Sequence, residues 1–125
     1  MANNTELGAV LSWTFSSQVT VPKDVNELLV PGEEAIVAYQ TIRDVAIFTN
    51  KRLIVKDAQG ITGKKVEMYT LPYKNIVMYS SENAGKLLDI NAEMELWTLA
   101  GHIKIKISSG ADVRKIDKIL AEYIL

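Results

Sequence analysis

Four glutamates are the residues of this chain that are best spaced for acid–base chemistry. Glu33 and Glu34 follow a Pro-Gly turn, and Glu93 and Glu95 lie two positions apart on an expected strand. Paired carboxyl groups of this kind can cleave a glycosidic bond, one as the acid and the other as base or nucleophile. Side chains two apart on a strand point to the same face of a sheet, and here we expect that face to be hydrated. We therefore interpret all four glutamates as solvated acids.

The composition restricts histidine and cysteine chemistry. His102 is the only histidine, and the chain contains no cysteine, which excludes disulfides, thiolate catalysis and cysteine-bound zinc. A metal site at His102 would need carboxylates as its other ligands, and no acidic pair has ligand spacing. Because His102 follows Gly101 at the start of an expected strand, we interpret it as an exposed polar residue. The sequence predicts no catalytic residue, no metal and no cofactor.

A glycine-rich basic segment, Gly60-x-x-Gly63-Lys64-Lys65, has some features of a phosphate-binding loop. Such a loop has four residues between its glycines, a serine or threonine after its lysine, and a helix behind it. Here two residues separate the glycines, Lys65 follows Lys64, and the segment joins two expected strands. We interpret it as a hairpin loop whose glycines provide positive φ angles.

Five cations lie on or beside short connections between expected strands, and they are the candidate anion contacts: Arg43, Lys51, Arg52, Lys64 and Lys65. If they converge, they would attract an anionic lipid or another anionic ligand, each contributing about 1 kcal/mol near an anionic surface. The other interpretation is an ordinary solvated face. The net charge of the chain is −1, which argues against nucleic acid as a partner.

Short alternating segments between turn residues predict a mostly β domain. We expect strands at residues 35–41, 44–50, 52–57, 65–71, 75–81, 92–99 and 102–108. In the last of them, isoleucines alternate with His102, Lys104 and Lys106, which is the period-two pattern of a strand with one wet face. Short strands at such regular spacing indicate a sandwich or a barrel.

Two helices are expected, one before and one after these strands. A short helix begins near Pro22 and ends at Pro31-Gly32, because that dipeptide interrupts helical structure. The second follows Asp112, its expected N-cap. It places six apolar residues on one face: Val113, Ile116, Ile119, Leu120, Tyr123 and Ile124. Since an amphipathic helix buries its apolar stripe, we expect this helix to close one open end of the sandwich.

The chain is long enough for one domain with its own core. We divide it into an N-terminal arm at residues 1–20 and a single domain at residues 21–125. The arm is rich in Asn, Ser and Thr, so we expect it to be only partly ordered. Its apolar stretch is short and has no preceding Lys or Arg, unlike a signal peptide, and no run approaches the roughly 20 apolar residues that span a bilayer. We therefore expect a cytoplasmic protein.

Five apolar residues are the candidate contacts between subunits: Trp13, Phe15, Ile36, Val37 and Tyr39. The first two lie on the polar arm, where they either fold back on the domain or pack on a neighbouring subunit. The other three make the first expected strand apolar on both faces. If that strand lies at a sheet edge, it needs cover, and the edge or arm of a neighbouring subunit would supply it.

From about residue 24 to its end, the sequence resembles the bacterial pleckstrin-homology domain family. Six blocks carry the resemblance: residues 29–33 (LVPGE), 42–44 (IRD), 48–54 (FTNKRLI), 57–65 (DAQGITGKK), 72–73 (PY) and 81–85 (SENAG). The resemblance implies a pleckstrin-homology fold, which is a seven-stranded bent sandwich or partly open barrel capped by one C-terminal helix. It also implies a ring-like homo-oligomer, no enzymatic activity, and a role in protein interaction.

The eukaryotic relatives grip a phosphoinositide headgroup with basic residues on and beside the loop between their first two strands. Here that loop is Ile42-Arg43-Asp44, which offers one cation and one anion and is too short to wrap a multiply charged ligand. We therefore expect a non-enzymatic, homo-oligomeric module that scaffolds an unidentified protein partner. The alternative is a peripheral binder of anionic lipid or another anion through the five cations, although we do not expect membrane lipid to be the main partner.

Overall fold

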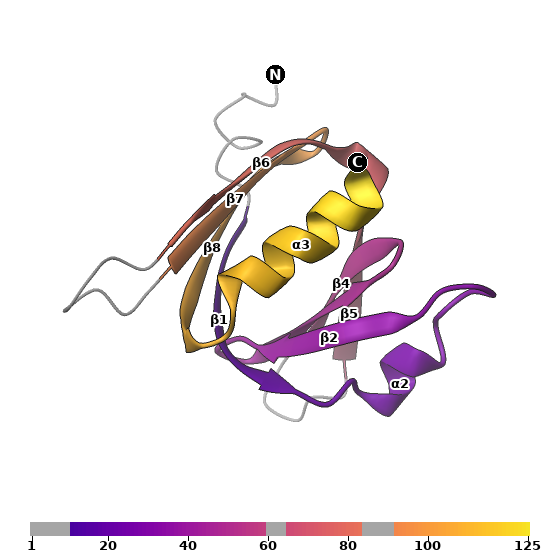
Figure 1. Cartoon of the computed structure of the whole chain (residues 1–125). Coiled ribbons are helices and arrows are strands. Elements are labelled where there is room, and N and C mark those ends of the chain that lie inside the picture. Colours follow the sequence, from indigo (N-terminus) through magenta and orange to yellow (C-terminus); the bar gives the residue numbers. More distant parts are fainter. Residues whose placement is uncertain (1–10, 60–64, 84–91) are drawn as a thin grey trace, which may run out of the picture.

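The computed structural model describes residues 11–59, 65–83 and 92–125 of the chain. These residues form one open sheet with the strand order β5-β4-β3-β2-β1-β8-β7-β6. The strands are β1 (Leu11–Val19), β2 (Ala35–Gln40), β3 (Asp44–Thr49), β4 (Arg52–Gln59), β5 (Lys65–Pro72), β6 (Ile76–Glu82), β7 (Ala92–Thr98) and β8 (Gly101–Gly110). Figure 1 shows that the sheet bends so that its two halves face each other. The mostly β class with one C-terminal helix is therefore confirmed.

The seven strands expected from alternation correspond to β2 through β8, and the boundaries agree within two residues. The short first helix, α2 (Lys23–Asn26), begins directly after Pro22. A single turn of 3-10 helix, η1 (Tyr73–Asn75), connects β5 to β6. The glycine-rich segment at residues 60–64, which includes Lys64, lies outside the described residues.

Residues 11–19 of the expected N-terminal arm form the strand that joins the two halves of the sheet, whereas residues 1–10 lie outside the described residues. β1 pairs in parallel with β8 from Leu11 to Ser17, and in antiparallel with β2 from Ser17 to Val19. Trp13 and Phe15 point to the core face and alternate with serine and threonine. This is the period-two pattern of a strand. The high content of Asn, Ser and Thr in residues 1–20 led to its interpretation as an arm instead.

The apolar character of β2 on both faces has an internal explanation. Val37 and Tyr39 point into the main core between the two halves of the sheet. Ala38 points the other way, into a smaller cluster with Val25 of α2. β2 lies between β1 and β3, so it is not the edge strand considered as one alternative from the sequence. A short helix of the same chain covers its outer face.

The C-terminal helix α3 (Val113–Ile124) has the amphipathic packing expected from its sequence. The Asp112 side chain accepts a hydrogen bond from the backbone N–H of Arg114 at 2.9 Å, which caps the first turn. Ile116, Ile119 and Leu120 are buried in the main core. In Figure 1 the helix lies across the inner side of the bent sheet. It therefore closes the core at one end, as the stripe of apolar residues required.

Gly110 ends β8 where that strand meets β1. A Cβ atom at this position would lie 2.3 Å from the backbone oxygen of Ser16. Because a backbone atom cannot rotate away, the two strands would have to separate. We expect Gly110→Ala to lower the free energy of unfolding by about 1–3 kcal/mol, the usual cost of overpacking, measured by urea denaturation. Lys106→Ala, at an exposed position of the same strand, is the control, and an equally small effect of both substitutions would contradict this expectation.

Candidate interaction edges and their polar junction

The two edges of the sheet are formed by β5 and β6, which are consecutive in the sequence. Within the described ranges, neither strand has a partner on its outer side. An edge strand presents unpaired N–H and C=O groups to another strand. β6 also exposes two apolar side chains, Val77 at 66% and Met78 at 54%. These two edges are candidate surfaces for association. The sequence did not indicate which strands would form the edges of the sheet.

The connection between the two edges is anchored to the turn between β3 and β4. The hydroxyl of Tyr73 donates a hydrogen bond to the backbone oxygen of Thr49 at 2.6 Å, and the Tyr73 side chain is buried. The backbone N–H of Tyr73 donates to the oxygen of Lys51 at 3.3 Å. These contacts hold η1 in one place and thereby hold the end of β5 and the start of β6 in a defined relation.

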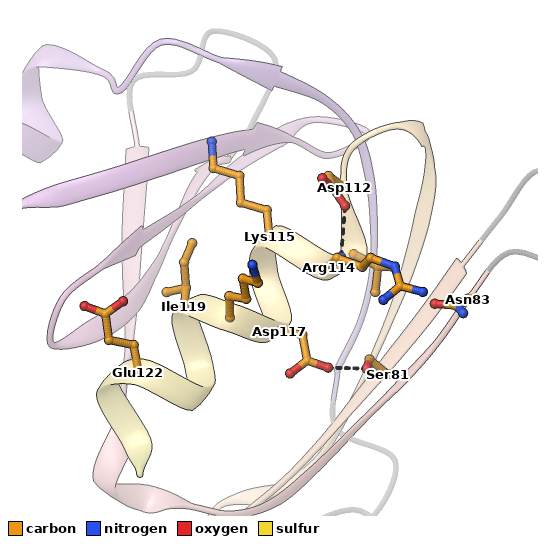
Figure 2. A pocket seen from close by; sticks show the side chains of 10 residues that line it. Ser81, Asn83, Asp112, Arg114, Lys115, Asp117, Ile119 and Glu122 are labelled. Atoms are coloured by element: carbon orange, nitrogen blue, oxygen red, sulfur yellow. Dashed lines mark hydrogen bonds between the residues drawn. The ribbon is translucent and has the colours of Figure 1, made fainter.

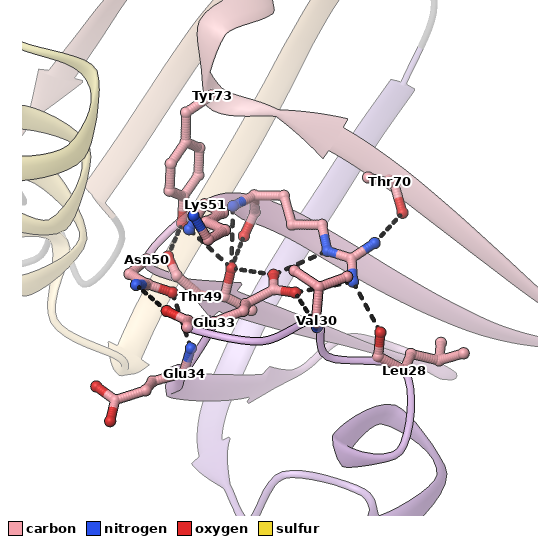
Figure 3. Close-up of polar contacts among 11 residues, drawn as sticks. Leu28, Val30, Glu33, Glu34, Thr49, Asn50, Lys51, Thr70 and Tyr73 are labelled. Atoms are coloured by element: carbon pink, nitrogen blue, oxygen red, sulfur yellow. Dashed lines mark hydrogen bonds and ion pairs between the residues drawn. The ribbon is translucent and has the colours of Figure 1, made fainter.

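A buried carboxylate, Glu33, is the centre of this junction (Figure 3). Arg52 binds it with two nitrogens, Nε to Oε2 at 2.8 Å and Nη2 to Oε1 at 3.0 Å. The Thr49 hydroxyl donates to Oε2 at 2.7 Å. The Glu33 side chain is fully buried, whereas the Arg52 side chain is 21% exposed. Glu33 is therefore not the solvated acid expected from the sequence, because the loop before β2 folds it under the guanidinium group.

The ionised state of Glu33 is strongly favoured. Burial of the carboxyl group by itself raises its pKa, but hydrogen bonds from Arg52, Thr49 and the Val30 N–H, together with the guanidinium charge, lower the pKa from 4.5 to about 2. Hydrogen bonds to a charged carboxylate have this effect because they stabilise only the ionised form. At neutral pH the junction therefore contains a charged, fully hydrogen-bonded ion pair.

The guanidinium group of Arg52 also reaches two other segments. Its Nη2 donates to the backbone oxygen of Leu28 at 3.2 Å, and its Nη1 donates to the Thr70 hydroxyl of β5 at 3.3 Å. Asn50 completes the junction by accepting a hydrogen bond from the Glu34 N–H at 2.8 Å. One arginine thus connects the loop after α2, the start of β4 and edge strand β5.

The candidate anion contacts do not form one cluster. Arg43 and Lys65 lie at one end of β3 and β4, while Lys51 and Arg52 lie at the other. At about 3.3 Å per residue, strand length alone separates the two groups by roughly 20 Å. Arg52 is already paired with Glu33. Lys51 instead shares a depression of about 500 Å³ with Lys74, a cation that sequence reasoning did not include.

Three of the candidate subunit contacts are buried inside the chain's own core. Phe15, Val37 and Tyr39 are each at most 3% exposed, and the ring of Phe15 stacks on that of Tyr39 with centroids 5.4 Å apart. Trp13 and Ile36 are half-buried against the same core. The arm aromatics thus fold back on the domain, which was the first of the two alternatives. If subunits associate, these three buried side chains are not available to form the contact between them.

His102 and the second glutamate pair lie on the outer face of β7 and β8. The imidazole ring stacks on Trp97 with centroids 4.8 Å apart, and its Nε2 lies 3.5 Å from Glu95 Oε1. Lys104 Nζ lies 3.8 Å from the same oxygen. His102 is therefore half-buried, not exposed, because the indole covers one side of its ring. Glu95 is the partner of Lys104 in a cross-strand ion pair, and Glu93 is exposed.

A broad depression of about 720 Å³ lies beside the first half of α3 (Figure 2). The Ser81 hydroxyl at the end of β6 donates a hydrogen bond to the Asp117 carboxylate, which attaches this edge strand to the helix. Charges of both signs line the depression, with Arg114 and Lys118 as cations and Asp112 and Glu122 as anions. It therefore has no net preference for a cationic or an anionic ligand.

A bent, open sheet closed at one end by a C-terminal helix defines the class of pleckstrin-homology folds. The family model of the bacterial PH domain matches residues 5–124, and the chain belongs to this family. The uncharacterized protein YjqA of Bacillus subtilis is 35% identical over 108 residues, which are 84% of this chain and 86% of that protein. None of the helices in the described ranges is long and apolar enough to cross a membrane.

Two solved structures extend the similarity to the fold. A DUF1696 family protein with a pleckstrin-homology domain from Shewanella loihica has a TM-score of 0.73 and 33% identity, covering 87% of this chain and 97% of that chain. A pleckstrin homology domain from Shewanella amazonensis has a TM-score of 0.62 and 40% identity, covering 82% of this chain and 83% of that chain. The fold expected from the resemblance is therefore confirmed.

Proposed function

We propose that this protein is a non-enzymatic interaction module that assembles into a homo-oligomeric ring and presents its surface to a protein partner. The observation that carries the proposal is the pair of different open edges in one sheet, β5 and β6. If β5 of one subunit pairs with β6 of the next, the interface is heterologous. Repetition of a heterologous contact produces a closed ring when the rotation between subunits divides a full turn.

The polar junction supports this arrangement because it determines the angle between the two edges. Glu33, Arg52 and Tyr73 hold the end of β5 and the start of β6 against the rigid β3–β4 turn. A constant angle gives every subunit contact the same rotation, which a closed ring requires. A ring then multiplies weak contacts with a partner into stronger overall binding.

The family supports a binding role, since pleckstrin-homology domains are in general non-catalytic modules. The separation of Arg43 from Lys51 by the length of β3 does not favour the alternative, a single basic site for anionic lipid. A cysteine-free chain is compatible with a reducing compartment, and we place the module in the cytoplasm.

Association through the edges is tested by placing charge on β6. We expect the wild-type protein to form a defined oligomer at tens of micromolar, and the double variant Val77→Lys, Met78→Lys to be a monomer, both measured by size-exclusion chromatography with light scattering. The side chains of Val77 and Met78 are exposed, so the variant should fold, and charged residues on an edge oppose strand pairing.

Ile42→Lys provides a matched control, because Ile42 is 92% exposed in the turn between β2 and β3 and belongs to neither edge. It should keep the oligomer of the wild-type protein. A monomeric wild-type protein would refute the ring. An oligomer that survives the double substitution on β6 would place the interface elsewhere.

A further inference from the structure

An apolar cavity of about 160 Å³ lies between the two halves of the sheet. Edge strand β5 contributes one wall with Tyr69 and Leu71, and β4 contributes Leu53 and Val55. The facing wall comes from Trp13 of β1, Thr98 at the end of β7, Ala100 in the turn between β7 and β8, and Ile103 of β8. The cavity lies beside the open edge of the sheet, and its lining shares no residue with that of the depression at Lys51.

Few polar groups around this cavity are available to a ligand or to water. Most of the lining comes from apolar side chains, among them Trp13, Leu53 and Leu71. The Tyr69 hydroxyl donates to Glu67 Oε1 at 3.2 Å, and the Thr98 hydroxyl donates to the backbone oxygen of Gly101 at 2.8 Å. Since a water molecule needs two to four polar partners to be stable in a cavity, this cavity favours an apolar occupant over water.

The size of the cavity limits the occupant. In another protein, a dry apolar cavity of about 150 Å³ binds benzene, so this one can take about six carbon atoms. An empty space of this size costs stability roughly in proportion to its volume, and an apolar ligand would recover that loss.

We propose that this cavity is a binding site for a short, unbranched alkyl chain of about six carbons. The proposal does not depend on the ring, since every lining residue belongs to one chain. It predicts a ligand-binding site on the inner face of the sheet, in addition to any surface that contacts other subunits.

Binding is measured through the fluorescence of Trp13, which lines the cavity. The chain has two tryptophans, so the full-length Trp97→Phe variant leaves Trp13 as the only indole. We expect saturable binding of 1-hexanol, with affinity rising about fourfold per methylene from 1-butanol to 1-hexanol. The gain should stop at 1-octanol, because the cavity is then full.

Two variants fill the cavity from two adjacent strands, Val55→Phe on β4 and Leu71→Phe on β5. Each should abolish the response to 1-hexanol, and Leu71 is only half-buried on an edge strand, so that its variant should fold even if Val55→Phe does not. Val45→Phe is the control, since Val45 packs in the separate cluster on the outer side of the sheet, and it should bind like the parent.

Three results would refute the proposed binding site. They are a linear, unsaturable response to 1-hexanol, an affinity that keeps rising to 1-octanol, and unchanged binding in a folded Leu71→Phe variant. Repeating the titration with the Val77→Lys, Met78→Lys substitutions added separates this proposal from the ring, since binding should persist in a monomer.

Discussion

Replacement of Arg52 by alanine is expected to lower the free energy of unfolding by about 3–5 kcal/mol, the cost of leaving one member of a buried ion pair without its partner. The Glu33 carboxylate is fully buried, and without Arg52 the hydrogen bonds to its oxygens within the described residues come only from the Thr49 hydroxyl and the Val30 N–H. The substitution also removes the links to Leu28 and Thr70. Urea denaturation monitored by circular dichroism measures the loss.

A more exposed ion pair, which joins β4 to α2, is the matched control. Lys56 Nζ lies 3.0 Å from Asp24 Oδ2, with side chains 24% and 46% exposed. Because solvent screens such a pair, Lys56→Ala should cost less than about 1 kcal/mol. Similar losses for Arg52→Ala and Lys56→Ala would show that burial of Glu33 contributes nothing, and would contradict the role given to the junction.

The pH dependence of stability identifies the same ion pair. The pKa of Glu33 is lowered from 4.5 to about 2 in the folded state, so below pH 4.5 the unfolded state binds the proton more readily than the folded state. The contribution of the ionised Glu33 carboxylate to stability is therefore complete above pH 4.5, and it is lost as the pH falls towards 2. Arg52→Ala should lose most of this dependence between pH 4.5 and 2, whereas Lys56→Ala should retain it.

Leu120→Ala is the second substitution with a large expected effect. Leu120 is completely buried where α3 packs on the main core. Removal of a buried leucine side chain costs about 2–5 kcal/mol, because apolar burial is lost and a cavity remains. We expect a loss of this size in the free energy of unfolding from urea denaturation, with the slope of the transition unchanged.

Lys118→Ala tests whether the loss comes from the packed face of the helix. Lys118 lies on the exposed face of α3, and alanine is a good helix former, so this change should stay within about 0.5 kcal/mol. If Leu120→Ala were equally neutral, α3 would not close the core, and the fold described above would lose the element that completes it.

The two substitutions have different consequences for the proposed assembly. Arg52 acts on the junction between β5 and β6, so a folded Arg52 variant should form oligomers of altered or mixed size. Leu120 is an apolar side chain in the main core and makes none of the hydrogen bonds of the junction, so a folded Leu120 variant should keep the wild-type size. The comparison therefore separates a loss of stability from a loss of the angle between the edges.

Local patterns were enough to predict most of the fold. The strict alternation at residues 102–108 and the short turns between the other segments predicted β2 through β8. The spacing of Ile116, Ile119 and Leu120 predicted the buried face of α3, and Asp112 predicted its cap. These features depend on side-chain periods and turn chemistry within a few residues. The family resemblance then supplied the arrangement of strands and helix.

β1 was not predicted, because its place depends on a distant part of the chain. Its partner β8 begins about ninety residues later, and no local pattern can reveal a parallel pairing over that distance. Serine and threonine surround Trp13 and Phe15, which gave the segment the composition of a loop. Only the tertiary structure buries Phe15 beside Tyr39 and makes the arm the strand that joins the two halves.

The candidate site shows the same division between local and distant information. The residue types of the junction were visible in the sequence, but Glu33 was taken for a hydrated acid and Arg52 for a free cation, because burial depends on how separate segments meet. The sequence by itself determined which segments form strands and helix, since those depend on neighbouring residues. The tertiary structure alone decided which strands became edges, which charges were paired and where an apolar cavity remained, because each requires contacts between residues far apart in the chain.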